Sequence, residues 1–548
     1  MKWHIQSPEP IKNLAALETV LLQNRGIENT TEFFNGVSPF VIELSTLGIK
    51  KKTIEQIKKR LKQAKKLQEQ IVIFGDYDAD GICATAVLWQ SLHASGYQVL
   101  PFIPNRLKHG YGLSIKALQE LLSQHPDTNL IITVDNGIVA HQALNFLASK
   151  KIEVIISDHH QSDEQTPAAL AVFHSTLVCG CAVAWFLARE VSESSQKALL
   201  TDLLALVAIA TVTDLMPLLA INRSLLMSGL IQLKTNRNLG LQKLLQQVKI
   251  DPAKIDSYAL GFQIGPRLNA MGRLADSMDA LRLLCTTNAQ KAQQLSNLLQ
   301  DTNENRQTLT ADLVKEAEEL VLKETEQNLI FLSSAKYHEG IIGLIAGKLT
   351  EKFSKPSIVV SEGEEIAKAS ARSLADFNIT EFIRFFKTDL LEMGGHPLAA
   401  GFALESKKIK TLKKAMQARA QQLLADQNLE KTLQIEAELE PVLIQIETAQ
   451  LLARFAPFGL SNPKPIFVLK KALLKNYRLF GKNQEHLRLS ITLTDDQKEY
   501  VVLYWRGAIA YSDFKIGQFY DLAFHLDLNY YRDQEQVQLI LQDYALVQ

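Results

Sequence analysis

Short apolar segments that end in acidic residues or histidines constrain the fold of this chain more than any other sequence feature. These segments are rich in β-branched residues, and stretches with helical periodicity separate them. The strand-like segments run over 71–74, 99–103, 130–134 and 154–156, and the helix-like ones over 84–94, 114–123 and 139–149. This alternation predicts a parallel sheet with right-handed crossovers, in which ligands bind beyond the carboxyl ends of the strands.

Polar clusters follow three of these strands directly. They read GDYDADG at 75–81, DNG at 135–137 and SDHH at 157–160, and Asp214 closes a later apolar helix. Carboxylates gathered on one sheet edge would repel each other without cations, and two divalent metal ions remove that repulsion. Mixed carboxylate and imidazole ligands suit Mn²⁺ or Mg²⁺, and such a metal pair supports phosphoester hydrolysis.

Each cluster also has a simpler interpretation when it is taken alone. The Asp-x-Asp-x-Asp-Gly pattern is typical of a calcium loop, although no Glu stands where such a loop requires one. Asp-Asn-Gly is typical of a turn, and Asp-His-His of a capped helix start. Their joint placement after successive strands favours a catalytic centre over coincidence.

The remainder of the chain predicts a long helix, a second α/β lobe and a β-rich tail. Residues 288–322 contain no Pro or Gly and indicate one helix between two lobes. Strands over 329–332 and 357–360 flank a helix over 341–352, and five strand-like segments after Pro457 predict a small OB-type barrel. The expected domains are an N-terminal segment 1–45, a catalytic α/β domain 46–285, a connecting helix 286–325, a smaller α/β substrate-binding domain 326–428 and an OB-like nucleic-acid-binding domain 429–548.

Amino-acid composition says little about the binding partners of the protein or its cellular compartment. Lys plus Arg (59) equals Asp plus Glu (59), so net charge gives no sign of a nucleic-acid partner. The four cysteines are too few and too irregular for a disulfide framework. The N-terminus lacks the apolar core of a signal peptide, and the most apolar run, 203–212, is too short to span a bilayer. We therefore expect a cytoplasmic protein without a membrane segment.

At the metal motifs the sequence resembles the DHH phosphoesterase family, and within it the RecJ branch of 5′→3′ single-strand-specific DNA exonucleases. The resemblance covers nearly the whole chain. The motifs that carry it are GDYDADG (75–81), VDNG (134–137), SDHH (157–160), TVTDLMPL (211–218), PNRLKHGYGLS (104–114), GPRLNAMGR (265–273), HEGIIGLIAGKL (338–349), KASARS (368–373), GGHPLAAG (394–401) and PFGLSNPKPIF (457–467). The segment 338–401 is similar to the DHHA1 domain, and the last motif to the start of the RecJ OB domain.

The resemblance implies roles for individual residues. The implied metal-binding and catalytic residues are Asp76, Asp78, Asp80, Asp135, Asp158, His159, His160 and Asp214, with Asp76 in or beside the ligand shell and His160 either on a metal or on the phosphate. The implied substrate-binding residues are Arg106, Arg267, Arg273, Ser370, Arg372, Gly394, Gly395 and His396. Guanidinium groups match phosphate oxygens bidentately, which agrees with these roles.

The chain departs from the family pattern in a few places. Phe74 stands where some relatives have His, Tyr337 where Trp is common, and Ser461 where a Gly precedes Asn-Pro. The largest departure follows residue 172, where FHSTLVCGCAVAW replaces a longer segment with an Asn-Pro pair. This connection is shortened, and the substrate contacts of the family cannot be carried over to it.

The implied function is a two-metal 5′→3′ exonuclease that acts on single-stranded DNA, releases mononucleotides and serves recombination and repair. The implied partners are single-stranded DNA, a single-strand-binding protein and a helicase, and a monomer is expected. Aromatic residues of the tail could stack bases, pack in the core or in a turn, or belong to a barrel that docks a protein; they are Tyr504, Trp505, Tyr530 and Tyr531, beside Arg506 and Arg532. The alternatives are a DHH phosphodiesterase for oligonucleotides or cyclic dinucleotides, which usually lacks such a tail, and a non-catalytic binding protein, which tends to lose metal ligands.

Overall fold

The computed structural model describes residues 2–110, 112–235, 237–323, 327–424, 432–493, 496–531 and 534–547. The chain forms two compact units. One comprises Ile42–Asp214 and Ser228–Glu430, and the other comprises Met1–Val41, Leu215–Met227 and Lys431–Gln548. Of the aromatic and basic residues noted in the tail, Arg532 and the side chains of Tyr530 and Tyr531 lie outside what the structure describes.

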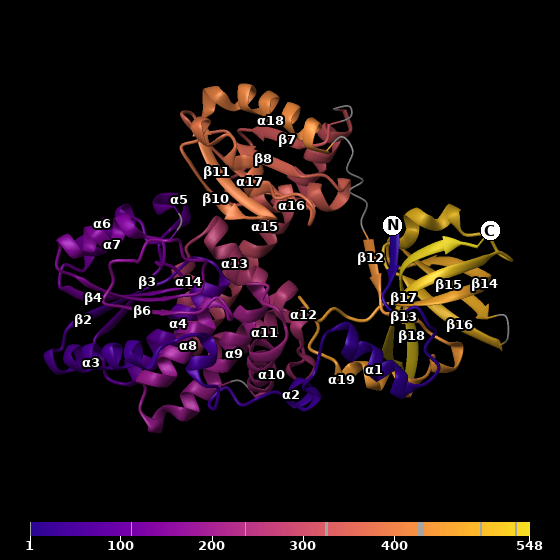
Figure 1. The fold of residues 1–548 in the computed structure, drawn as a ribbon, viewed down its shortest axis with the longest axis horizontal. Coiled ribbons are helices and arrows are strands. Elements are labelled where there is room, and N and C mark those ends of the chain that lie inside the picture. The colour runs from indigo at the N-terminus through magenta and orange to yellow at the C-terminus, as the bar shows by residue number, and fades with distance from the viewer. Residues whose placement is uncertain are drawn as a thin grey trace. The chain divides into compact units, whose positions relative to one another are not determined.

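The first unit contains the predicted parallel sheet, in the strand order β3-β2-β4-β5-β6 (Figure 1). Its strands are β2 (Gln70–Phe74), β3 (Val99–Phe102), β4 (Thr128–Val134), β5 (Glu153–Asp158) and β6 (Ala171–His174). All neighbouring strands pair in parallel, which confirms the fold class for this part of the chain. The strand β6 was not expected, because its four residues show too short an apolar pattern to be recognised.

Helices cover both faces of this sheet. They are α3 (Lys51–Leu67), α4 (Ala79–Ala94), α5 (Arg106–His109), α6 (Ile115–Gln124), α7 (His141–Ser149), α8 (Gly180–Val191) and α9 (Lys197–Thr213). Leu118 of α6 and Leu144 of α7 pack against Val72 and Ile131 on one face. Helix α4 begins at Ala79, earlier than the apolar pattern indicated, because the Asp78 side chain caps it by accepting from the Gly81 N–H.

The apolar run 203–212 lies inside a longer helical segment than the sequence suggested. Ser194–Thr213 forms 20 helical residues, which by length and composition alone could cross a membrane. Shortness was therefore the wrong reason to set this run aside. Ala208 and Ile209 are fully buried within the unit, as expected for a core helix.

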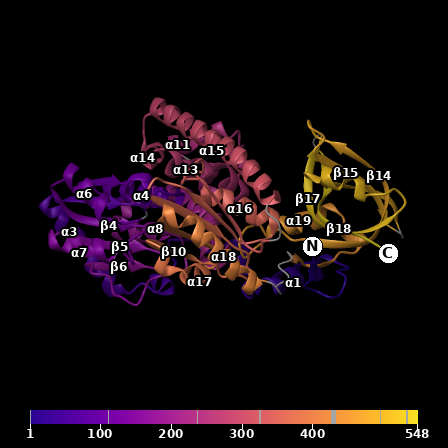
Figure 2. The ribbon, with the colours of Figure 1, turned by 90° about the horizontal axis from the view of Figure 1, so that it is seen from above.

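The predicted long helix is confirmed as α15 (Ala289–Lys323). It packs against α11 (Leu239–Gln247), α13 (Gly265–Leu274), α14 (Ser277–Cys285) and α16 (Ile342–Phe353), so it connects the parallel sheet with the second lobe (Figure 2). The remaining helices of this region are α10 (Ala220–Lys234) and α12 (Ser257–Ala259).

The second lobe is a five-stranded mixed sheet in the order β10-β11-β9-β8-β7. Its strands are β7 (Ile330–Ser334), β8 (Ser357–Ser361), β9 (Ile366–Arg372), β10 (Glu392–His396) and β11 (Ala399–Glu405), and α17 (Ile379–Arg384) and α18 (Ile409–Leu424) accompany them. Only β7 and β8 pair in parallel. The sequence predicted these two strands and α16, and the antiparallel strands were not expected.

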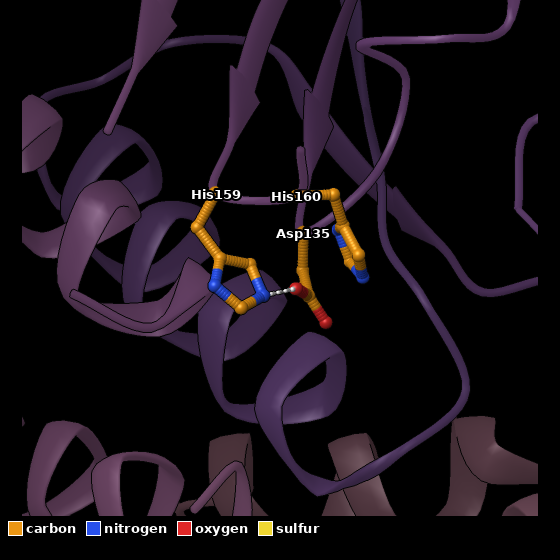
Figure 3. A group of neighbouring side chains, drawn as sticks. All are labelled: Asp135, His159 and His160. Atoms are coloured by element: carbon orange, nitrogen blue, oxygen red, sulfur yellow. Dashed lines mark ion pairs between the residues drawn. The ribbon is translucent and has the colours of Figure 1, made fainter. Parts of the chain in front are cut away.

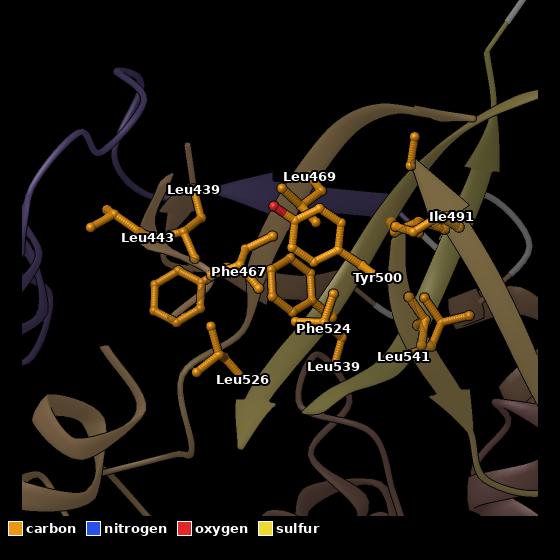
Figure 4. Close-up of a cluster of buried hydrophobic side chains, with 14 of the residues drawn as sticks. Leu439, Leu443, Phe467, Leu469, Ile491, Tyr500, Phe524, Leu526, Leu539 and Leu541 are labelled. Carbon is orange, nitrogen blue, oxygen red and sulfur yellow. The ribbon is translucent and has the colours of Figure 1, made fainter. Parts of the chain in front are cut away.

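The other unit contains the predicted barrel. It is built from β14 (Phe467–Phe480), β15 (His486–Leu493), β16 (Asp496–Tyr504), β17 (Phe519–Tyr531) and β18 (Gln534–Leu546). Strand β14 pairs with both β15 and β17, which closes the sheet on itself. Phe467, Tyr500 and Phe524 meet in its interior together with leucines of the surrounding strands (Figure 4).

N-terminal residues belong to the same unit as the barrel. Strand β1 (Lys2–Ile5) pairs in parallel with β12 (Thr432–Ile435). Helices α1 (Leu14–Asn24), α2 (Thr30–Asn35) and α19 (Ile446–Arg454), together with β13 (Ala437–Glu438), complete this unit. Leu17, Leu21 and Phe33 share one buried cluster with the barrel residues.

Candidate metal centre

The loop between β2 and α4 is folded tightly around its acidic residues. Asp76 and Asp80 are only 1% and 2% exposed. A Cβ atom on Gly81 would lie 2.5 Å from the Asp76 carbonyl oxygen, so glycine is required there. The α13 segment supports the loop from below, because the Asn269 side chain accepts from the Ala79 N–H at 2.9 Å. This packing explains why the GDYDADG and GPRLNAMGR segments occur together in one chain.

Asp135 is held in an unusual backbone conformation after β4. Its φ is +62°, a left-handed conformation that Asp and Asn tolerate better than most residues. The side chain is 2% exposed and faces the start of α8, where a Cβ on Gly180 would lie 2.4 Å from Asp135 Oδ1. Asp135 therefore lies in the turn that the Asp-Asn-Gly motif suggested, and its buried carboxylate is also available as a metal ligand.

Seven of the eight predicted ligands gather into three overlapping groups that could each hold a metal ion. The groups are Asp135 with His159 and His160, Asp80 with His159 and Asp214, and Asp76 with Asp78 and Asp135. Within each group the candidate ligand atoms lie within 4.8 Å of one another. Figure 3 shows the His159 imidazole directed at the Asp135 carboxylate, with Nε2 and Oδ1 3.1 Å apart. Because the groups share residues, the arrangement suits neighbouring cations.

Asp158 is the predicted ligand that these groups do not include. Its Oδ1 accepts from the backbone N–H groups of His159 and His160, at 2.7 and 3.2 Å, and lies 2.8 Å from His160 Nδ1. Its Oδ2 accepts from the Ile138 N–H at 2.9 Å. These contacts orient the His160 ring through its Nδ1 and fix the backbone that carries both histidines.

Burial of several carboxylates together changes their protonation. Burial, reinforced by the charge of Asp78, raises the pKa of Asp80 to about 7. Burial and the neighbouring Asp80 raise the pKa of Asp214 to about 9, and burial raises the pKa values of Asp76 and Asp135 well above their ordinary values. The acids therefore hold protons that a cation would displace.

The two histidines of the centre differ in protonation. Burial and the neighbouring His160 lower the pKa of His159 to about 4, so its neutral ring can bind a metal. Burial also disfavours the charged form of His160, but the hydrogen bond and charge of Asp158 outweigh it and raise that pKa to about 9. The Oδ1 atoms of Asp76 and Asp135 are buried without a hydrogen-bond partner, and a divalent cation fits beside both.

Five arginines gather in the same unit, each within electrostatic reach of at least one other. They are Arg106 of α5, Arg267 and Arg273 of α13, Arg306 of α15 and Arg372 of β9. Burial, together with the charges of Arg106, Arg306 and Arg372, lowers the pKa of Arg273 to about 10. Among the described residues, none of the five forms an ion pair with a carboxylate. Glu304 supplies one negative charge near Arg267, and a bound anion such as a phosphate would stabilise the remainder of the cluster.

Local contacts hold these arginines in place. The Arg106 guanidinium lies 5.3 Å from the centre of the Tyr77 ring. Arg267 donates to the Gln300 side chain at 2.7 Å, and Arg273 donates to the Gly340 carbonyl of the second lobe at 3.0 Å. Arg306 donates to Asn303, while its Nε is buried without a partner.

The second lobe presents the remaining predicted residues. The Arg372 guanidinium donates to Ser370 Oγ at 3.2 Å and to the Ala371 carbonyl at 2.8 Å. Gly394, Gly395 and His396 lie on β10, the edge strand of the sheet, where Gly395 has a φ of +150°. The charge of His396 contributes to the lowered pKa of His159, which places this strand end close to the metal centre.

Family models match three regions of the chain. Residues 70–211 match the DHH family N-terminal domain, 326–422 the DHHA1 domain, and 435–543 the RecJ OB domain. The single-stranded-DNA-specific exonuclease RecJ of Bacillus subtilis (strain 168) is 30% identical over 574 residues, which covers 100% of this chain and 71% of the relative. The chain belongs to the RecJ family.

Solved structures of the family agree with this assignment. RecJ from Thermus thermophilus in complex with Mn²⁺ superposes with a TM-score of 0.83 at 27% identity, and covers 99% of this chain and 79% of that one. The same protein in complex with Mg²⁺ gives a TM-score of 0.75 at 26% identity, over 99% of this chain and 78% of that one. The family membership, the catalytic fold and the OB-type barrel inferred from the sequence are confirmed.

Two residues near the centre were missed from the sequence. Arg306 lies in a long polar helix, where nothing in the pattern separates it from a solvated arginine. His174 ends the unexpected strand β6, and its Nε2 lies 2.7 Å from the His160 carbonyl oxygen. The only signal for His174 was the departure from the family pattern after residue 172.

Proposed function

We propose that this chain is a metal-dependent exonuclease that hydrolyses single-stranded DNA from its 5′ end and releases 5′-mononucleotides. The observation that carries the proposal is the pairing of two features in one unit. A buried acid and histidine centre suits divalent cations, and a cluster of arginines without carboxylate partners suits phosphate groups.

The residues that would hold two cations, Mn²⁺ or Mg²⁺, are those of the three overlapping groups: Asp76, Asp78, Asp80, Asp135, His159, His160 and Asp214. Bound there, the cations would supply a water of lowered pKa and positive charge for the scissile phosphate. Asp158 keeps His160 oriented through its Nδ1. If a cation does not occupy the His160 ring, its pKa, raised to about 9, allows it to donate a proton to a phosphate oxygen or leaving group instead.

The arginines and the second lobe explain a preference for a strand end. Arg372 and Ser370 form a compact polar pair on β9, and Arg106 and Arg273 lie within electrostatic reach of Arg372 or of one another. This group of cationic and polar side chains suits a terminal phosphate, which carries more charge than an internal one. A 5′-phosphate bound there would place the first phosphodiester bond toward the metal centre, which sets the polarity of digestion.

The proposal is tested with single strands labelled at either end, digested with Mn²⁺ or Mg²⁺ and compared with the same reaction in EDTA. We expect early release of the 5′ label as a mononucleotide, no release in EDTA, and little digestion of blunt duplex. Preferential release of the 3′ label would overturn the polarity. Cleavage that persists in EDTA would overturn the metal requirement.

The small-substrate DHH phosphodiesterase gains no support from the second unit. A match to the RecJ OB domain over residues 435–543 favours longer strands, because OB barrels bind extended single strands. Turnover of dinucleotides should therefore be slower than turnover of long strands. Faster turnover of dinucleotides would favour the alternative.

We also propose that the enzyme is a cytoplasmic monomer that works with a single-strand-binding protein and a helicase in recombination and repair. The proposed substrate supports this setting, since single strands in cells are coated by protein and generated by unwinding. Light scattering tests the monomer, and digestion of coated against naked strands tests the protein partner. Equal inhibition by a coating protein from an unrelated source would argue against a specific contact.

A further inference from the structure

His174 occupies a position that neither the metal motifs nor the family pattern assigns. It is the last residue of β6 and lies opposite Asp158 in the parallel register of β5 and β6. It lies at the start of the connection between β6 and α8. The residue that follows, Ser175, donates its N–H to the Asp158 carbonyl at 3.3 Å, so the β5–β6 pairing continues to the edge of the metal centre.

The His174 ring contacts the backbone of His160, the second of the two metal-centre histidines. Its Nε2 lies 2.7 Å from the His160 carbonyl oxygen. A carbonyl oxygen can only accept a hydrogen bond, so Nε2 carries the proton and donates it. The ring is partly buried, which protects this hydrogen bond from competition with water.

The same His159-His160 backbone is held from its other side by Asp158. The Asp158 carboxylate accepts from the N–H groups of both histidines, while His174 donates to the carbonyl of the second. A rotation of this short segment would break at least one of these contacts. It would also move the ring of His159 away from Asp135, to which Nε2 is now 3.1 Å.

The shortened connection reaches a second set of candidate ligands at its other end. It runs from His174 to the start of α8, where the N–H groups of Gly180 and Cys181 each donate to the Asp80 carboxylate at 2.7 Å. One short segment thus contacts the backbone of His160 at one end and the side chain of Asp80 at the other. Because the segment is short, a shift of the backbone at one of these contacts would displace the other.

We propose that His174 is a positioning residue for the metal centre, which fixes the His159-His160 backbone through the hydrogen bond from Nε2 to the His160 carbonyl. The inference rests on the metal centre of the proposed function, but not on the nature of the substrate or the polarity of cleavage. Groups that orient metal ligands in this way typically change metal affinity by about 10–100-fold when they are removed.

The decisive comparison uses two substitutions of similar length, His174→Gln and His174→Met. Both fill the space of the ring, and only glutamine can donate to the His160 carbonyl. Mn²⁺ affinity is measured on the full chain without substrate, by calorimetry or by electron paramagnetic resonance of free Mn²⁺. We expect His174→Met to bind Mn²⁺ about 10–100-fold more weakly and His174→Gln to retain most of the affinity.

A matched control variant and a comparison of the effects on kcat and on KM distinguish a positioning role from general destabilisation. His141→Met removes another histidine of the same unit, whose Nε2 lies 2.9 Å from the Asp163 carboxylate and which belongs to none of the candidate metal groups, and should leave Mn²⁺ affinity unchanged. On single-stranded DNA at saturating Mn²⁺, His174→Met should lower kcat more than it raises KM. The metal-free melting temperature of His174→Gln and His174→Met should agree, since they differ in one hydrogen bond near a loop.

Two results would overturn the proposal. The first is Mn²⁺ affinity of His174→Met equal to that of the unsubstituted chain. The second is equal loss in His174→Gln and His174→Met, which would indicate that the imidazole acts through its size or through Nδ1. If the unsubstituted chain binds Mn²⁺ but does not cut single strands, the proposed function fails while this comparison still decides the role of His174.

Discussion

Buried charge in the barrel unit differs in its partners from buried charge at the metal centre of the other unit. In the unit with the barrel, Glu436 and Arg25 form an ion pair at 2.7 Å, with side chains 7% and 3% exposed. Asn24 also donates to Glu436 at 2.7 Å. Arg223 there donates to the carbonyls of Phe33, Phe455, Ala456 and Pro457. These buried charges have partners that satisfy them.

The metal centre of the other unit satisfies only part of its buried charge. Asp80 and Asp158 accept backbone N–H groups. Asp76 and Asp135 each keep a buried oxygen without a hydrogen-bond partner, and within the described part of the chain five arginines form no ion pair with a carboxylate. A buried charge without a partner is costly. The contrast indicates that the paired buried charges of the barrel unit serve structure, whereas the unsatisfied charges of the metal centre mark the place where ions and substrate complete the site.

The largest expected effect on activity follows from removing one buried carboxylate of the metal centre. Asp135→Asn keeps the left-handed backbone, which Asn also tolerates, but removes a candidate ligand of two groups. We expect Mn²⁺-dependent cleavage to fall by about 1000-fold, or roughly 4 kcal/mol of activation free energy. The metal-free protein should melt no lower than the unsubstituted chain, because repulsion among the acids decreases. Retention of more than a tenth of the activity would remove Asp135 from the ligand set.

The same chemical change in the barrel unit should have the opposite profile. Glu436→Gln leaves the Arg25 guanidinium buried without a counter-charge, and we expect the free energy of unfolding to drop by about 3 kcal/mol. Denaturant titration measures this loss. The cleavage rate per folded molecule should be nearly unchanged. If Glu436→Gln and Asp135→Asn altered stability in the same direction, the contrast between satisfied and unsatisfied charge would not hold.

Stability of the metal-free protein should fall as pH rises. Asp80 and Asp214 have folded-state pKa values of about 7 and about 9, well above the ordinary value of 3.8. Between pH 4 and 9 the unfolded chain therefore binds fewer protons than the folded one, so the free energy of unfolding decreases with pH. We expect the melting temperature to decline by roughly 5 °C or more from pH 5 to pH 8.5. Saturating Mn²⁺ should remove most of this decline, and a flat metal-free profile would contradict it.

The smallest expected effect concerns the arginine cluster. Arg306→Gln removes one of five like charges, so stability should not decrease, while KM for single strands should rise by about 10-fold. The salt dependence of binding should weaken at the same time, because one phosphate contact is lost. Arg282→Gln is the matched control, since that arginine pairs with Asp279 on the surface of the same unit. Equal KM values for the two variants would exclude Arg306 from the substrate path.

The sequence predicted the catalytic sheet and its functional edge well because both depend on local patterns. Apolar β-branched strands recur between amphipathic helices, and parallel topology forces the groups after β2, β4 and β5 to one edge. The start of α4 was misjudged because Asp78, the residue that caps it, lies among polar residues that resemble a loop. The mixed sheet of the second lobe was only half predicted, since β9, β10 and β11 are rich in Ala and Gly rather than in β-branched residues.

Long-range contacts set the limit of prediction at the site. Nothing near Arg306 in the sequence indicates that Arg267 and Arg273 lie within electrostatic reach of it. The contact of His174 with the His160 carbonyl depends on the register of β6, a strand that the pattern did not reveal. Likewise, the donation of the Gly180 and Cys181 N–H groups to Asp80 joins residues 100 and 101 positions apart.

The pairing of β1 with β12 has a consequence for synthesis on the ribosome. Strand β1 ends at Ile5 and its partner begins at Thr432. At translation rates of roughly 5–20 residues per second, β1 leaves the ribosome about 20–85 s before β12 exists. During that interval the N-terminal strand has no strand partner and the apolar face of α1 lacks the barrel residues of its buried cluster, although the parallel sheet can already fold. A nascent chain stalled before residue 432 should therefore expose residues 2–24 to protease or chaperone while its catalytic sheet is protected.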